Sequence, residues 1–121
     1  MFKHAKNNQV LNPHTEMIVT NGACEALYST LHHLVQQGDE VIFFEPYYTQ
    51  YVNYAEFAGA TVKTAPLKLI NGVWHYDFET FERLITPNTK VLMITNPHNP
   101  TGKLFTKDEL LKLTEILERH P

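Results

Sequence analysis

Cysteine is almost absent from this chain of 121 residues, and Cys24 is the single one. One thiol cannot form a disulfide within the chain or complete a cysteine-based zinc cage. No apolar run approaches the roughly 20 residues that span a bilayer, and Met1 to Val10 lacks the apolar centre of a signal peptide. These absences predict a cytoplasmic protein with no membrane partner.

Clustered positive charge is also missing. Ten Lys and Arg stand against 13 Asp and Glu, for a net charge of −3, and the basic residues are scattered singly from Lys3 to Arg119. We therefore expect no nucleic-acid partner. His32 and His33 are neighbours on a predicted helix and do not share one face, so we expect no metal site. The chain has no nucleophile elbow, dinucleotide fingerprint or Walker loop.

Apolar residues, at 43% of the chain, are frequent enough for a packed core. Along the chain, the spacing of the apolar residues alternates between the pattern of a strand and the pattern of a helix. Strands are predicted at 17–20, 41–44, 61–67 and 91–95. Helices are predicted from Cys24 until Gly38, from Tyr47 or Tyr48 to about Phe57, from Asp77 through Leu84, and after the capping box Thr106–Glu109.

This order predicts an α/β fold with a mostly parallel sheet and helices on both faces. Pro66 suggests an edge strand or the end of a strand's pairing, and Asn71-Gly72 a turn. The last helix is expected to bury a stripe of four residues, Leu110, Leu113, Ile116 and Leu117. Open sheets of this kind bind ligands at the carboxyl ends of their strands.

Three loops follow the best strands. Asn21–Cys24 precedes a helix, where backbone amides and the helix dipole favour a phosphate, although a simple tight turn is the better explanation of this loop taken alone. In Glu45–Tyr48, either tyrosine could stack on a flat heterocycle or pack at a helix start. Asn96–Lys103 holds two Asn-Pro steps and a glycine, a constraint that favours a functional loop with two fixed amide side chains.

These loops together resemble the fold-type I, pyridoxal-phosphate-dependent aminotransferases of class I and II, and among them the kynurenine/glutamine transaminase and cysteine-conjugate β-lyase group. The similarity runs from about residue 9 to the end. The segments that carry it are Val19–Leu27, Gly38–Val41, Glu45–Tyr48, Ala58–Ala60 and Asn96–Lys103. The resemblance implies that residues 1–121 are a single partial domain, a fragment of the large cofactor-binding domain, with 1–16 irregular.

The resemblance also implies the chemistry. The parent enzyme would use pyridoxal 5′-phosphate to move an amino group from an amino acid to a 2-oxo acid. A full-length parent would be a homodimer of the cytoplasm or the mitochondrion. Two other readings stay open, a non-catalytic truncated aminotransferase fragment and a pyridoxal-phosphate-dependent β-lyase of the same fold.

Four cofactor-binding residues are implied by the resemblance. Ala23 and Cys24 would give backbone amides to the cofactor phosphate, Tyr48 would stack on the pyridine ring, and Asn99 would donate its side-chain amide to the phenolic oxygen. The peptide bonds before Pro46 and Pro100 would be cis.

The family's remaining machinery has no counterpart in these residues. We find no match to the Schiff-base lysine, to the aspartate that pairs with the pyridine nitrogen, or to the arginine that holds the substrate carboxylate. No catalytic residue is therefore expected in this chain. A fragment of this kind would expose apolar strand edges and be marginally stable.

Overall fold

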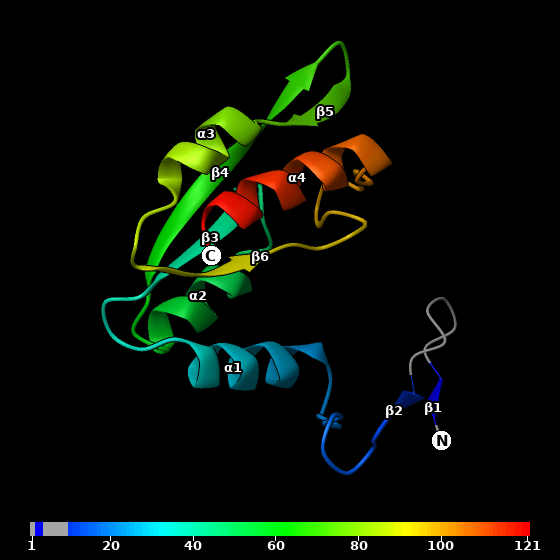
Figure 1. Ribbon diagram of the computed structural model, residues 1–121, viewed down its shortest axis with the longest axis vertical. Coiled ribbons are helices and arrows are strands. Elements are labelled where there is room, and N and C mark those ends of the chain that lie inside the picture. Colours follow the sequence, from blue (N-terminus) through cyan, green and yellow to red (C-terminus); the bar gives the residue numbers. More distant parts are fainter. Residues whose placement is uncertain (1, 4–9) are drawn as a thin grey trace.

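A four-stranded sheet forms the centre of the molecule, with strands in the order β5-β4-β3-β6 (Figure 1). The computed structural model describes residues 2–3 and 10–121. The strands are β3 (Glu40–Glu45), β4 (Thr61–Ile70), β5 (Val73–Tyr76) and β6 (Thr89–Met93). β3 pairs in parallel with β4 and β6, and β4 pairs antiparallel with β5. The mostly parallel sheet is confirmed, with an antiparallel hairpin added.

Helices cover both faces of this sheet, as predicted. α1 (Ala23–Leu34) and α2 (Gln50–Phe57) lie on one side, and α3 (Phe78–Leu84) and α4 (Lys107–Arg119) on the other (Figure 1). Each face of the sheet has its own hydrophobic core, and β3 contributes to both because its successive side chains point to opposite faces. Val41 and Phe43 pack with α1 and α2, whereas Ile42 and Phe44 pack with α3 and α4. All four side chains are buried.

The strand predicted at 17–20 is wrong. These residues have no regular structure, and Ile18 and Val19 are 87% and 95% exposed. β-branched residues favour a strand only where a neighbour pairs with it and its side chains pack, and no strand among the described residues does so here. The first helix also ends earlier than predicted, because Val35 turns to an extended conformation and enters the core.

β4 is longer than predicted. Of the two interpretations of Pro66, the end of a strand's pairing is confirmed, whereas β4 as a whole is not an edge strand, because it lies between β5 and β3. Pro66 is opposite Glu45 in the last register pair with β3, and Leu67 opens the pairing with β5. Pro66 therefore marks the end of one pairing inside an internal strand. The Asn71-Gly72 turn is confirmed, with both residues at positive φ as a two-residue hairpin turn requires.

The helix caps are those expected from the sequence. The Asp77 carboxylate accepts the Thr80 N–H at 3.1 Å at the start of α3, and Thr106 and Glu109 form a complete capping box at the start of α4. On α4, Leu113 and Ile116 are buried, whereas Leu110 and Leu117 are exposed, so the predicted stripe is half wrong. The second helix begins at Gln50 rather than at Tyr47 or Tyr48.

The amino-terminal segment was expected to be irregular through residue 16. Within the described part of it, β1 (Phe2–Lys3) and β2 (Val10–Leu11) form a short antiparallel pair. Residues 1 and 4–9 lie outside the described residues. Among the residues that the structure covers, no helix has the length and apolar character needed to cross a membrane.

Candidate functional site

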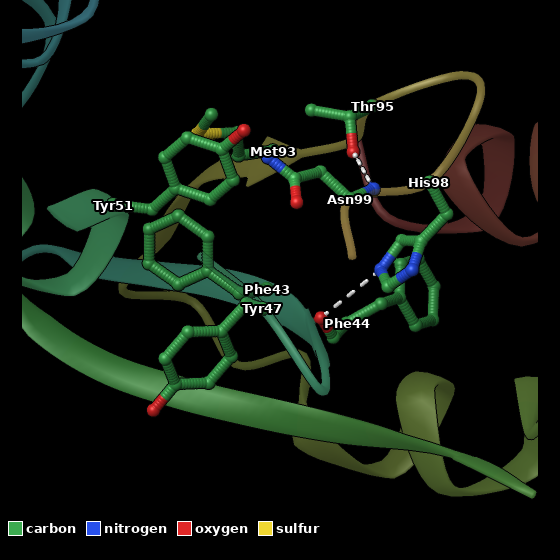
Figure 2. A pocket seen from close by; sticks show the side chains of 8 residues that line it. All are labelled: Phe43, Phe44, Tyr47, Tyr51, Met93, Thr95, His98 and Asn99. Atoms are coloured by element: carbon green, nitrogen blue, oxygen red, sulfur yellow. Dashed lines mark hydrogen bonds between the residues drawn. The ribbon is translucent and has the colours of Figure 1, made fainter. Parts of the chain in front are cut away.

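The parallel strands β3 and β6 end at the same edge of the sheet, and two of the three predicted loops begin there. A small cavity lies between the ends of these two strands and the loops that follow them (Figure 2). Its walls come from the ends of both strands, from the loop after each and from α2. The lining residues are Phe43, Phe44, Tyr47, Tyr51, Met93, Thr95, His98 and Asn99. The carboxyl edge of the sheet therefore holds a cavity where the fold class predicts a ligand.

Asn99 is the predicted site residue that lines this cavity. Its backbone N–H donates to Thr95 Oγ1 at 3.0 Å, and its side chain extends past Thr95 towards Tyr51 and Met93 (Figure 2). Among the described residues, the Asn99 side-chain amide makes no hydrogen bond. The backbone is thus fixed while two amide hydrogens remain available to a ligand.

Tyr48 lies beside the cavity rather than in its wall. Its side chain is 44% exposed, and its ring packs edge-on against Tyr51, with 5.4 Å between ring centroids. Tyr51 lines the cavity and stacks on Phe43. Tyr47 is more buried and also packs on Phe43. Of the two tyrosines in this loop, Tyr48 has the ring with more open surface.

Ala23 and Cys24 form the first turn of α1. Gly22 precedes them at φ 87° and ψ 174°, and the first main-chain bond of the helix runs from Ala26 N–H to the Gly22 carbonyl at 3.3 Å. The Glu25 carboxylate accepts the N–H of residue 21. Within the described chain, the N–H groups of Ala23 and Cys24 have no hydrogen-bond acceptor. They are free donors at the positive end of the helix dipole.

Helix α2 connects these two parts of the site. The neighbouring Cys24 side chain, then desolvation, and last the charge of Tyr48 raise the pKa of Tyr54 on α2 above its ordinary value. Cys24, Tyr54 and Tyr48 are therefore neighbours. The four predicted residues gather around α2 and the carboxyl edge, but the cavity itself encloses only Asn99 of the four.

His98 is a residue of this site that sequence reasoning missed as a functional group. Its side chain is buried, with Nδ1 2.8 Å from Thr101 Oγ1 and Nε2 3.4 Å from the Phe44 carbonyl oxygen. Burial lowers the pKa of His98 below its usual value, and the Phe44 carbonyl only partly opposes this. The one signal in the sequence was its place inside the constrained loop.

The peptide bonds before Pro46 and Pro100 are cis, as the resemblance implied, and the bond before Pro97 is cis as well. Among the residues with described positions, no group of three His, Cys, Asp or Glu side chains is placed to hold a metal ion.

Comparison with known proteins identifies close relatives of this chain. A family model described as aminotransferase class I and II matches residues 1–121. A protein of Saccharomyces cerevisiae named "Probable kynurenine–oxoglutarate transaminase" is 41% identical over 84% of this chain and 25% of its own length. A kynurenine–oxoglutarate transaminase of Dictyostelium discoideum is 32% identical over 91% of this chain and 28% of its own.

Solved structures give the same result. N-succinyldiaminopimelate aminotransferase from Mycobacterium tuberculosis superposes with a TM-score of 0.82 at 39% identity, over 87% of this chain and 27% of that one. Cystalysin from Treponema denticola, whose structure contains pyridoxal 5′-phosphate, superposes with a TM-score of 0.78 at 29% identity. The match covers 83% of this chain and 26% of that one. The chain spans about a quarter of the length of the relatives it matches.

Proposed function

Since this chain belongs to the family of class I and II aminotransferases, we propose that the protein acts as a pyridoxal-5′-phosphate-dependent transaminase. It would move an amino group from an amino acid to a 2-oxo acid, and kynurenine is the first donor to test, because two of the relatives carry that name. Residues 1–121 would form one partial domain that supplies much of the cofactor site. The observation that carries the proposal is a chain of neighbours. Asn99 and Tyr51 line one cavity, Tyr51 packs against Tyr48, and Tyr54 on the same helix lies near both Tyr48 and Cys24 at the start of α1.

The residues present fit this cofactor. A phosphate needs several donors in a concave place, and the N–H groups of Ala23 and Cys24 are available at a helix start. The glycine before them leaves open space, because nothing lies within 4 Å of a Cβ built at Gly22. The half-open ring of Tyr48 and the unpaired amide of Asn99 match a flat heterocycle with an anionic oxygen.

Each of these groups has a distinct task. When bound, pyridoxal 5′-phosphate supplies an electron sink for the bonds that break at the substrate's α-carbon. The amides of Ala23 and Cys24 hold its phosphate. Tyr48 covers one face of the ring and excludes water from it. The Asn99 amide donates to the phenolic oxygen and stabilises its negative charge.

The lysine closest to these groups in sequence is already engaged. Lys103 Nζ lies 2.9 Å from a Glu109 carboxylate oxygen, and its side chain is mostly buried. This ion pair engages Lys103, so it is not proposed as the Schiff-base lysine.

Cofactor binding is tested on this chain by equilibrium dialysis against pyridoxal 5′-phosphate. Tyr48→Ala and Asn99→Ala should each weaken binding by about tenfold, the loss expected for one stacking contact or one charge-assisted hydrogen bond. Tyr48→Phe keeps the ring and should bind as the parent does. Asn88→Ala is the matched control for Asn99, because Asn88 lies at the opposite edge, where its carbonyl accepts the Glu40 N–H.

Amino transfer is tested on the protein expressed from its complete gene. Kynurenine and a panel of other L-amino acids are offered with 2-oxoglutarate, and formation of glutamate is followed. Transfer from at least one donor, dependent on added pyridoxal 5′-phosphate, is expected. Absence of both transfer and cofactor binding would contradict the proposal, and elimination of a β-substituent without amino transfer would replace it with a β-lyase.

A further inference from the structure

The loop that carries Asn99 contains 13 residues of irregular chain, from Ile94 to Thr106, between β6 and α4. Two short main-chain hydrogen bonds close its centre. His98 N–H donates to the Lys103 carbonyl and Gly102 N–H donates to the His98 carbonyl, both at 2.7 Å. His98 is thus the residue around which the loop folds.

The same residue joins the loop to the neighbouring strand. β6 pairs with β3 as far as Met93 and Phe43, and the His98 imidazole then reaches the carbonyl of the next β3 residue, Phe44, across 54 positions of sequence. The ring also lies edge-on to Tyr76, with 6.3 Å between centroids. A side chain therefore continues the connection between the two strands at the point where their pairing stops.

The Phe44 contact fixes a hydrogen on Nε2, and burial, which lowers the pKa of His98, favours the neutral ring. A carbonyl oxygen only accepts, so Nε2 must carry a hydrogen to bond Phe44. Nδ1 of a neutral ring then accepts, and the Thr101 hydroxyl can donate to it at 2.8 Å. That hydroxyl oxygen in turn accepts the Lys103 N–H at 3.3 Å. Every group has one complementary partner when His98 is neutral with its hydrogen on Nε2.

We propose that His98 is a positioning residue for the Asn99 side chain, acting as a neutral Nε2–H imidazole that ties the Asn99 loop to the end of β3. β3 also leads directly into the loop of Tyr48, so the tie sets Asn99 relative to Tyr48. The consequence for cofactor binding rests on the proposed function, whereas the tie itself depends only on the contacts of His98.

The tautomer is measured directly by two-bond hydrogen–nitrogen NMR correlation on the uniformly ¹⁵N-labelled chain at pH 7.5. His98 should show a protonated Nε2 and an unprotonated Nδ1. The exposed His75 serves as the internal comparison, because no hydrogen bond among the described residues fixes its ring. A cationic ring, an Nδ1–H ring or a free mixture at His98 would overturn the proposal.

A pair of variants tests positioning without removing the buried ring. Thr101→Val keeps the volume but removes the donor to Nδ1, and Thr101→Ser keeps the hydroxyl. The valine variant should keep the hydrogen on Nε2 through the Phe44 carbonyl but broaden or shift the Asn99 side-chain NH₂ signals, while the serine variant should match the parent. Unchanged Asn99 signals in Thr101→Val would refute the positioning role.

Cofactor affinity separates this inference from the function proposed above. Thr101→Val should bind pyridoxal 5′-phosphate about fivefold more weakly than Thr101→Ser. If the parent chain binds none, the proposed function fails and the NMR results still decide the role of His98. If both variants bind equally while the parent binds well, the link between His98 and the cofactor is refuted.

Discussion

The ion pair between Lys103 and Glu109 connects the Asn99 loop to the first turn of α4, and its removal should cost more than an ordinary surface pair. Lys103 Nζ lies 2.9 Å from one carboxylate oxygen and 3.0 Å from the other. The side chains are only 11% and 19% exposed. Lys103→Met keeps most of the aliphatic stem and leaves the Glu109 carboxylate poorly solvated, with only the Thr106 N–H of the capping box as a donor.

The expected magnitude follows from this burial. Breaking a fully buried ion pair lowers the free energy of unfolding by about 3–5 kcal/mol. An exposed pair contributes only about 0.2–1 kcal/mol. Since some water reaches both groups, we expect Lys103→Met to lower the free energy of unfolding by about 2–3 kcal/mol. Arg83→Met is the matched control, because Arg83 and Glu79 form a pair that is 64% and 83% exposed, and it should cost about 0.5 kcal/mol or less.

Urea unfolding at 25 °C, followed by Trp74 fluorescence, measures both variants. A double-mutant cycle with Glu109→Gln isolates the interaction and should give a coupling of about 1.5–2.5 kcal/mol. If Lys103→Met is no more destabilising than Arg83→Met, or the coupling stays below about 0.5 kcal/mol, the pair does not anchor the loop.

The same pair has a defined pH dependence. Burial alone would raise the pKa of Glu109, but the hydrogen bonds from Thr106 and the ammonium of Lys103 outweigh it and hold the pKa below 4.5. A depressed pKa in the folded state contributes stability above the unfolded value, and this is lost as the pH falls through the folded value. The difference between the parent and Lys103→Met should therefore shrink in acid.

Three further outcomes follow from single contacts. The hydrogen bond with Lys68 is the largest cause that lowers the pKa of Asp77 to about 2. Asp77→Asn should therefore lower the free energy of unfolding, measured by urea titration, above pH 3.8, and this loss should vanish as the pH approaches about 2. Phe81→Ala in the core should cost about 3–5 kcal/mol, against about 0.5 kcal/mol or less for the exposed Phe57→Ala. Gly22→Ala should cost about 1–3 kcal/mol because of its positive φ and should weaken pyridoxal 5′-phosphate binding in dialysis by moving the amides that follow.

Local patterns predicted the elements whose signal is contained in consecutive residues. The continuous apolar run of β3 identified a strand buried on both faces, and the cap residues Asp77 and Thr106 located two helix starts. The strand at 17–20 failed because β-branching is only a preference and pairing needs a neighbour from elsewhere. Pro66 correctly indicated the end of a strand's pairing, but nothing near it in the sequence shows that β4 continues with β5 as its new partner.

For the site, too, local motifs could be recognised in the sequence, whereas long-range contacts could not. The resemblance supplied Ala23, Cys24, Tyr48 and Asn99, whose roles remain predictions, and the structure brings them to one side of the sheet. His98 could not be found from the sequence, since its functional contact is with a carbonyl 54 positions earlier. A histidine in a loop carries no sign that it is buried until the sheet, β5 and the loop are assembled together.

The arrangement of the site is set by the register of β3 and β6 more than by its loops alone. Tyr48 follows β3 and Asn99 follows β6, and the pairing of Phe43 with Met93 fixes where the two strands end relative to each other. A slip of one residue would turn the buried side chains of β3 to the opposite helical layers, so both cores oppose it. The packing that stabilises the fold therefore also holds the groups proposed to bind the cofactor, and the proposed role of His98 extends that control into the irregular chain after β6.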